Sequence, residues 1–95
     1  MKQPAVYILA NSRNGTLYTG VTSNLPQRVW QHRESVADGF TKRHGCKALV
    51  WFVLAETMEA AITKEKRIKA GSRAKKLALI EGMNPHWRDL YEDIA

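Results

Sequence analysis

The chain has 95 residues and a mass of 10.8 kDa, enough for one hydrophobic core but too little for separate catalytic and recognition domains. Its 44% apolar and 25% charged residues are typical of a folded globular protein and argue against disorder. The longest uncharged apolar run, residues 48–55, is too short for a membrane span, and residues 1–4 lack a signal peptide's apolar stretch. The single cysteine, Cys46, excludes an internal disulfide and a cysteine-based zinc site, so we expect a cytosolic protein.

Positive charge is concentrated in one part of the chain. Residues 1–80 carry fourteen Lys and Arg against five acids, whereas residues 81–95 carry one Arg against four acids. Seven of the fifteen cations lie between Lys64 and Lys76. At a pI of about 9.8, such a surface favours phosphate backbones, although a solvated helix face would have the same composition.

Two β-rich runs, residues 5–11 and 16–22, predict a β-hairpin. A two-residue turn at Asn14-Gly15 would separate Tyr7 and Tyr18 along the strands, and we favour a four-residue loop from Ser12 to Gly15. This loop sets Tyr7 opposite Gly20 and leaves Tyr18 on the diagonal of the same face, within reach of one phosphate-sized ligand. Gly20 leaves space beside the two rings. Two tyrosines on one sheet face are also common in ordinary core packing.

The rest of the chain predicts three helices and one strand. Asn24 caps a first helix that runs to about Val36 and stops at Asp38–Gly39. Residues 47–56 predict a buried strand. Two further helices follow, capped by Thr57 and Ser72 and ended by Gly71 and Gly82, and a tail from Asn84 packs back through Trp87, Leu90 and Tyr91. The expected order is β-β-α-β-α-α.

Polar side chains of the first predicted helix fall near its buried side. Arg28 and His32 are one turn apart and lie on or beside the apolar stripe of Leu25, Val29 and Val36. Burial of such groups is costly unless they have partners. A snorkelling arginine and a histidine satisfied in the core would explain the pattern without any chemistry.

The second predicted helix turns a carboxylate inward. Glu65 falls within the arc of Met58, Ala61 and Ile62, with Ile68 at its flank, whereas Lys64 and Arg67 point away. An inward carboxylate needs a cation. Arg28 could be that cation, in an ion pair with Glu65. A bound divalent metal is the alternative, since Mg²⁺ is commonly held by one carboxylate, waters and a substrate phosphate.

These residues together resemble the GIY-YIG nuclease superfamily from Ala5 to about Leu90. The two family triplets appear as Ala5-Val6-Tyr7 and Tyr18-Thr19-Gly20. The nearest likeness is to the small stand-alone bacterial members that are similar to the amino-terminal domain of a bacterial excinuclease. It extends to the stretches Ser72-Arg73-Ala74-Lys75-Lys76 and Asn84-Pro85.

The resemblance implies one α+β nuclease domain over residues 1–95, with a three-stranded antiparallel sheet flanked by helices, that cuts phosphodiesters with Mg²⁺ or Mn²⁺. Glu65 would bind the metal, while Tyr18, with Tyr7 adjacent, would deprotonate or position the attacking water. Arg28 would stabilise phosphoryl charge, and His32 would exchange a proton with Tyr18. Asn84 matches the family's late Asn and would orient the site by hydrogen bonds.

Function stays open between three classes. The first is an endonuclease acting on DNA, with RNA as the alternative, in repair or turnover. The second is a non-catalytic nucleic-acid-binding module, and the third is a protein-interaction domain or homodimer using Trp30, Trp87 and the acidic tail. Nucleic-acid affinity is assigned to Lys66, Arg73, Lys75 and Lys76, with Arg33, Lys42 and Arg43 as the alternative face.

Overall fold

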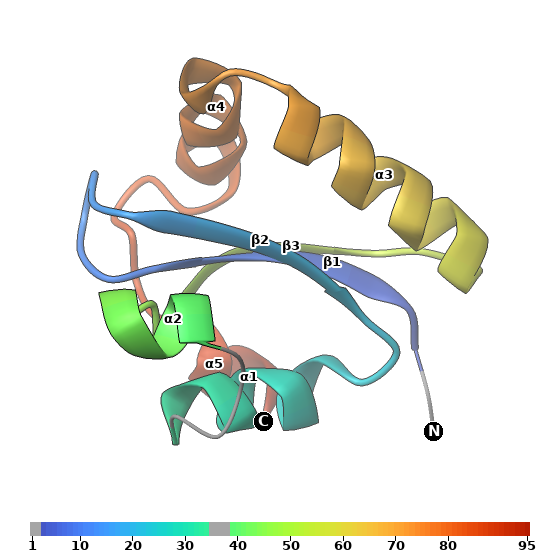
Figure 1. Cartoon of the computed structure of the whole chain (residues 1–95), viewed down its shortest axis with the longest axis horizontal. Coiled ribbons are helices and arrows are strands. Elements are labelled where there is room, and N and C mark those ends of the chain that lie inside the picture. Colours follow the sequence, from blue (N-terminus) through green and yellow to red (C-terminus); the bar gives the residue numbers. More distant parts are fainter. Residues whose placement is uncertain (1–2, 35–38) are drawn as a thin grey trace.

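The computed structural model describes residues 3–34 and 39–95, and these form a three-stranded antiparallel sheet with helices on both faces (Figure 1). The strands are β1 (Ala5–Ala10), β2 (Leu17–Thr22) and β3 (Ala48–Leu54), in the order β2-β1-β3. The α+β fold expected from the sequence is therefore confirmed. Within the described residues, every helix is too short or too polar to span a bilayer.

The β1–β2 hairpin has the predicted four-residue loop. Tyr7 pairs with Gly20, and Leu9 pairs with Tyr18. The loop is closed by a hydrogen bond of 2.9 Å from the Gly15 amide to the Ser12 carbonyl. Asn14 has a φ of 59°, a left-handed conformation that asparagine tolerates better than most residues.

Three of the helices start at the predicted caps. The helices are α1 (Leu25–Arg33), α2 (Gly39–His44), α3 (Met58–Ala70), α4 (Arg73–Met83) and α5 (Tyr91–Ile94). Asn24, Thr57 and Ser72 each accept a hydrogen bond from the backbone amide three residues later, at 3.2, 3.1 and 3.2 Å. These bonds satisfy amides at the amino-terminal ends of α1, α3 and α4.

The helix ends differ more from expectation. Helix α1 ends at Arg33, and the predicted extension to Val36 and the stop at Asp38 lie outside the described residues. The short helices α2 and α5 were not predicted, so the described order is β-β-α-α-β-α-α-α. The predicted stop at Gly82 is wrong, because α4 continues to Met83 and Asn84 caps it with a 2.6 Å bond from its amide to the Ile80 carbonyl.

The sheet separates two apolar layers. On one face, Tyr7 and Leu9 pack with Val29 of α1 and with the tail at Leu90. On the other face, Val6 and Ile8 pack with Ala61 of α3 and Ile80 of α4. Figure 1 shows this division, with α1, α2 and α5 on one side of the sheet and α3 and α4 on the other. Every residue of β1 is buried as a result.

The apolar arc predicted for α3 is only partly buried. Ala61 is fully buried and Ile68 is half-buried, but Met58 and Ile62 are 36% and 37% exposed. The prediction that Met58 and Ile62 face the core is therefore wrong.

The tail packs on the domain as predicted, with Trp87 and Leu90 buried and Tyr91 half-buried. The Leu90 amide donates to the Leu49 carbonyl at 2.7 Å, and Asp89 forms an ion pair with Arg33 of α1. Trp30 is 49% exposed as expected, whereas Trp87 is only 8% exposed, which corrects the expectation that its side chain is an exposed part of an interaction surface.

Candidate active site

Three aromatic residues predicted from the sequence meet on the α1 face of the sheet. The ring centroids of Tyr7 and Tyr18 are 6.3 Å apart, and the His32 ring lies 5.7 Å from Tyr7 and 5.3 Å from Tyr18. The Tyr7 hydroxyl and His32 Nε2 form a buried hydrogen bond of 3.0 Å. Tyr7 and His32 are each 1% exposed, whereas Tyr18 is only half-buried. Tyr18 is therefore the tyrosine of the pair that a substrate or water reaches.

Gly20 determines where the Tyr7 ring lies. A Cβ built at Gly20 would be 2.5 Å from both Cζ and the hydroxyl oxygen of Tyr7, far inside van der Waals contact. The space expected beside the tyrosines is thus filled by the Tyr7 ring itself. A glycine opposite Tyr7 allows the phenol to lie flat across β2 and reach His32.

Arg28 and His32 project from successive turns of α1, as their spacing predicts. Arg28 is half-buried, and its Nη1 donates a hydrogen bond of 3.0 Å to Oε1 of Gln31. A guanidinium presents a planar set of donors that matches phosphate oxygens, and a half-buried arginine packs its stem on the domain. Arg28 therefore lies on the same helix as the histidine of the cluster.

Glu65 faces inward as predicted, but from the opposite layer. Its side chain is 12% exposed, and its Oε2 lies 2.7 Å from Nζ of Lys69, one turn along α3. Helix α3 packs on the face that holds Val6 and Ile8, and it contacts β2 more than any other strand. Since β2 is an edge strand, a site using both Glu65 and Tyr18 would extend around this edge of the sheet.

The donor set fits a metal that takes most of its ligands from water and substrate. Glu65 offers a carboxylate, the hard oxygen ligand that Mg²⁺ and Mn²⁺ prefer. Among the residues that the structure describes, no group of three or more His, Cys, Asp or Glu side chains could hold an ion without such help. Lys69, at 52% exposed, keeps its ammonium largely in water, so a cation of higher charge can replace it beside the Glu65 carboxylate.

The structure does not bring Asn84 to the aromatic cluster. The side-chain amide nitrogen donates to the carbonyls of Val50 and Arg88 at 3.2 and 2.7 Å, and the side-chain oxygen accepts from the Arg88 amide at 3.0 Å. Val50 belongs to β3, at the other edge of the sheet from β2. Asn84 thus anchors the tail on β3.

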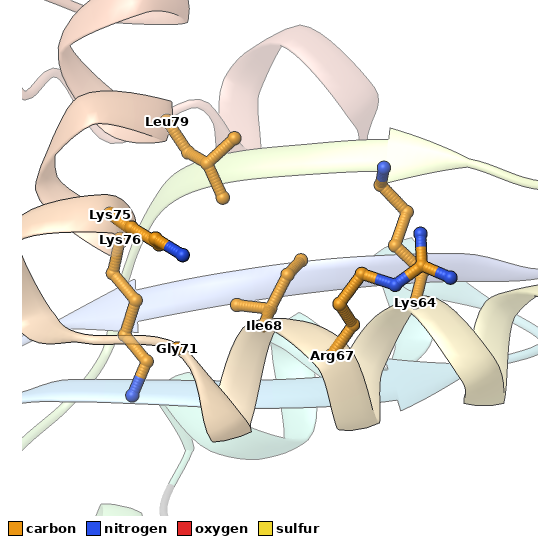
Figure 2. Close-up of a pocket in the computed structure, with 7 residues that line it drawn as sticks. All are labelled: Lys64, Arg67, Ile68, Gly71, Lys75, Lys76 and Leu79. Carbon is orange, nitrogen blue, oxygen red and sulfur yellow. The ribbon is translucent and has the colours of Figure 1, made fainter.

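The four predicted nucleic-acid-binding cations have different surroundings. Arg73 donates to the carbonyls of Asn14 and Gly15 at 2.8 and 2.6 Å, which ties α4 to the β1–β2 loop. Lys66 is exposed on α3. Lys75 and Lys76 line a pocket between α3 and α4 together with Lys64 and Arg67 (Figure 2). Lys64 and Arg67 were expected to point away from the core, and both are indeed exposed. The sequence did not predict that these two residues line a pocket.

Cys46 takes no part in this surface. The thiol is buried and lies 3.6 Å from the Thr16 carbonyl, which accepts its weak hydrogen bond. Burial raises the pKa of the Cys46 thiol, so the reactive thiolate is disfavoured. Cys46 is a core residue of the α1 face.

Comparison with known proteins defines the class of this chain. The family model of the GIY-YIG catalytic domain matches residues 3–78, and the protein belongs to this nuclease family. The match includes both tyrosines, Arg28, His32 and Glu65, whereas Asn84 lies beyond it.

Within the family, the chain is similar to proteins named UPF0213. A UPF0213 protein of Vibrio cholerae is 33% identical over 84 residues, covering 87% of this chain and 83% of the relative. One from Clostridium perfringens is 37% identical over 75 residues, covering 79% and 80%. The solution NMR structure of a UPF0213 protein from Bacillus halodurans has a TM-score of 0.57 and 28% identity, covering 94% of this chain and 93% of that one.

Proposed function

We propose that this protein is a metal-dependent endonuclease that hydrolyses phosphodiester bonds in nucleic acid, with DNA as the substrate and RNA as the alternative. The observation that carries the proposal is the cluster of Tyr7, Tyr18 and His32, in which a half-buried tyrosine lies beside a buried tyrosine–histidine hydrogen bond. The whole of residues 1–95 would form this one nuclease domain.

Each residue of the site has a role in the proposal. Tyr18 positions or deprotonates the attacking water, and the Tyr7–His32 pair beside it holds its ring and exchanges protons. Arg28 stabilises charge on the phosphoryl oxygens through its planar donors. Glu65 would hold one Mg²⁺ or Mn²⁺, which when bound would supply positive charge that stabilises the phosphoryl group during cleavage. Asn84 acts at a distance, by holding the tail in place on β3.

Surface cations supply affinity in this proposal rather than chemistry. Lys66, Lys75 and Lys76 meet phosphates of the bound strand, while Arg73 orients the loop beside them. The lone buried cysteine is in keeping with a reducing, cytosolic compartment. A role in DNA repair or turnover follows from the proposed activity.

A second candidate is a non-catalytic module that binds nucleic acid. It is favoured by one observation, the ion pair of Glu65 with Lys69 on the layer opposite the tyrosines. In this alternative, the ion pair is permanent and the basic surface alone has a function.

Cleavage assays with two matched variants separate the candidates. Labelled single-stranded, duplex and branched DNA and RNA are incubated with Mg²⁺ or Mn²⁺ and the wild type, Glu65→Gln or Glu59→Gln. Glu59 is an exposed acid of the same helix and serves as the control. We expect the wild type to cleave only with metal. Glu65→Gln should abolish cleavage without loss of folding or binding, and Glu59→Gln should cleave at the wild-type rate.

Other outcomes of the same assay contradict the proposal. Cleavage that Glu65→Gln does not reduce, or that needs no metal, would remove Glu65 from the mechanism. Salt-sensitive binding without any cleavage identifies the module, and the absence of both identifies a protein-interaction domain.

A further inference from the structure

The pocket between α3 and α4 has an unusual composition. Its volume is about 290 Å³, close to the lower end of the range for small-ligand sites. Four of the seven residues that line it are cations, namely Lys64, Arg67, Lys75 and Lys76, and none is an acid. Figure 2 shows the two α3 cations on one side of the pocket and the two α4 lysines on the other.

These four cations have no carboxylate partner in the part of the chain that the structure describes. Within residues 3–34 and 39–95, none of them forms an ion pair or a side-chain hydrogen bond, whereas Arg33, Lys69 and Arg88 each pair with a carboxylate. Like charges around one hollow repel each other, and the repulsion is relieved when an anion enters.

The start of α4 points to the same conclusion independently. Acidic residues are favoured in the first turn of a helix because the helix dipole is positive there. Helix α4, which has 11 residues, instead starts with Arg73, Lys75 and Lys76 and has no acid in its first turn. The pocket reaches this helix end through Gly71 and Lys75, so a bound anion would offset both the dipole and the lysines.

The floor of the pocket is apolar. Ile68 and Leu79 are both half-buried, and in Figure 2 their side chains face one another between the two helices. A bare inorganic anion makes no use of such a surface, but the sugar or base of a nucleotide packs on it while its phosphate meets the cationic rim.

We propose that this pocket is a nucleotide-binding site, in which Lys64, Arg67, Lys75 and Lys76 bind phosphate and Ile68 with Leu79 contacts the sugar or base. The nucleotide has two possible sources. One is a free nucleotide. The other is a nucleotide of the substrate strand that flanks the cut, since Ile68 lies about 4.5 Å along the α3 axis from Glu65. The second source rests on the proposed nuclease function, and the first does not.

The test measures binding without cleavage. Uniformly ¹⁵N-labelled full-length protein in EDTA is titrated with thymidine 3′,5′-bisphosphate, which contains no phosphodiester to cut, and with pyrophosphate and thymidine as comparisons. We expect amide shifts at Ile68, Gly71, Lys75 and Leu79 with the bisphosphate, weaker binding of pyrophosphate at the same residues, and no binding of thymidine. Equal affinity for pyrophosphate and the bisphosphate would overturn the role of the apolar floor.

Two double variants establish the location. Arg67→Ala with Lys75→Ala, both exposed positions, should weaken bisphosphate binding tenfold or more. Arg13→Ala with Lys47→Ala removes the same charge from exposed positions outside the pocket and should leave the affinity unchanged. Equal loss in both pairs, or no loss in either, would overturn the proposal in favour of a diffuse charge effect.

Competition identifies the source of the nucleotide. A labelled oligonucleotide is bound to the Glu65→Gln protein in EDTA, and the bisphosphate is then added. If the oligonucleotide is displaced at bisphosphate concentrations near the dissociation constant of the bisphosphate, the pocket holds a nucleotide of the strand. If the oligonucleotide and the bisphosphate bind at the same time, the pocket holds a free nucleotide. Both results are measured without cleavage, so an inactive wild type would refute the nuclease proposal while leaving the proposed nucleotide site in place.

Discussion

The hydroxyl of Tyr7 and Nε2 of His32 share a hydrogen bond of 3.0 Å inside the core, between the central strand and helix α1. Both residues are 1% exposed, so each supplies a hydrogen-bond partner to a buried polar group of the other. The sequence resemblance implies a proton exchange between His32 and Tyr18. In the structure, the Tyr7 hydroxyl is a hydrogen-bond partner of His32 Nε2, and the His32 ring also lies 5.3 Å from the Tyr18 ring.

Removal of the Tyr7 hydroxyl should therefore cost stability. Tyr7→Phe deletes the partner of His32 Nε2 in this buried bond, and the loss of such a partner costs about 1–3 kcal/mol. We expect a lower free energy of unfolding in urea, together with a smaller loss of cleavage rate than Tyr18→Phe causes. The matched comparison is Tyr18→Phe, where the half-buried ring should change stability little. Equal stabilities of the wild type and Tyr7→Phe would mean that the buried bond contributes nothing.

A pair of glycine substitutions tests the contact between the two strands. Gly20→Ala forces a methyl group against the Tyr7 ring and hydroxyl, so we expect destabilisation by about 1–3 kcal/mol and displacement of the ring from His32. Gly82→Ala is the control, because nothing lies within 4 Å of its added Cβ and α4 is helical there. It should stabilise the protein by about 0.5–1 kcal/mol. Thermal unfolding of both variants measures the difference, and an unaffected Gly20→Ala protein would contradict the contact.

The local features of the fold were readable from the sequence, and the tertiary ones were not. The loop of Ser12–Gly15 fixed the register of Tyr7 with Gly20, and Asn24, Thr57 and Ser72 marked the helix starts through bonds three residues away. The end of α4 depends on Asn84, whose side chain binds Val50 on a distant strand. A glycine at position 82 was therefore the wrong stop signal, because the helix ends at Asn84, whose amide bonds to the Ile80 carbonyl and whose side chain is held by a residue 34 positions away.

The sequence predicted which residues form the candidate site better than it predicted how these residues are arranged. Strand alternation and helical periodicity correctly turned Tyr7, His32 and Glu65 inward. These patterns could not show which tyrosine forms the buried bond with Nε2 of His32. They also could not show that α3 packs on the layer opposite α1, since both features depend on packing between distant elements. The pairing of Glu65 with Lys69 was within reach of the sequence, because residues four apart on a helix are neighbours.

The surface cations should differ in their effect on nucleic-acid binding. Lys66→Ala with Lys76→Ala should weaken binding to all sequences and lower the slope of log K against log salt by about 1 per lysine, because fewer counter-ions are released. Arg73→Ala should mainly lower stability, since the carbonyls of Asn14 and Gly15 lose their donor. Fluorescence anisotropy at several salt concentrations measures the slopes. An unchanged slope in the lysine pair would move the binding face to Lys42 and Arg43, as Arg33 is already paired with Asp89.

Tyr18 should affect the rate of cleavage through its hydroxyl rather than its ring. Tyr18→Phe removes the oxygen that would accept or orient the proton of the attacking water, while the ring keeps its contacts with Tyr7 and His32. General acid–base help of this kind is worth about 10² to 10⁴ in rate, so single-turnover cleavage should slow by that factor while the midpoint of thermal unfolding stays close to that of the wild type. A folded Tyr18→Phe protein that cuts at the wild-type rate would make the tyrosine a packing residue. In that case another group must activate the water, even in an active nuclease.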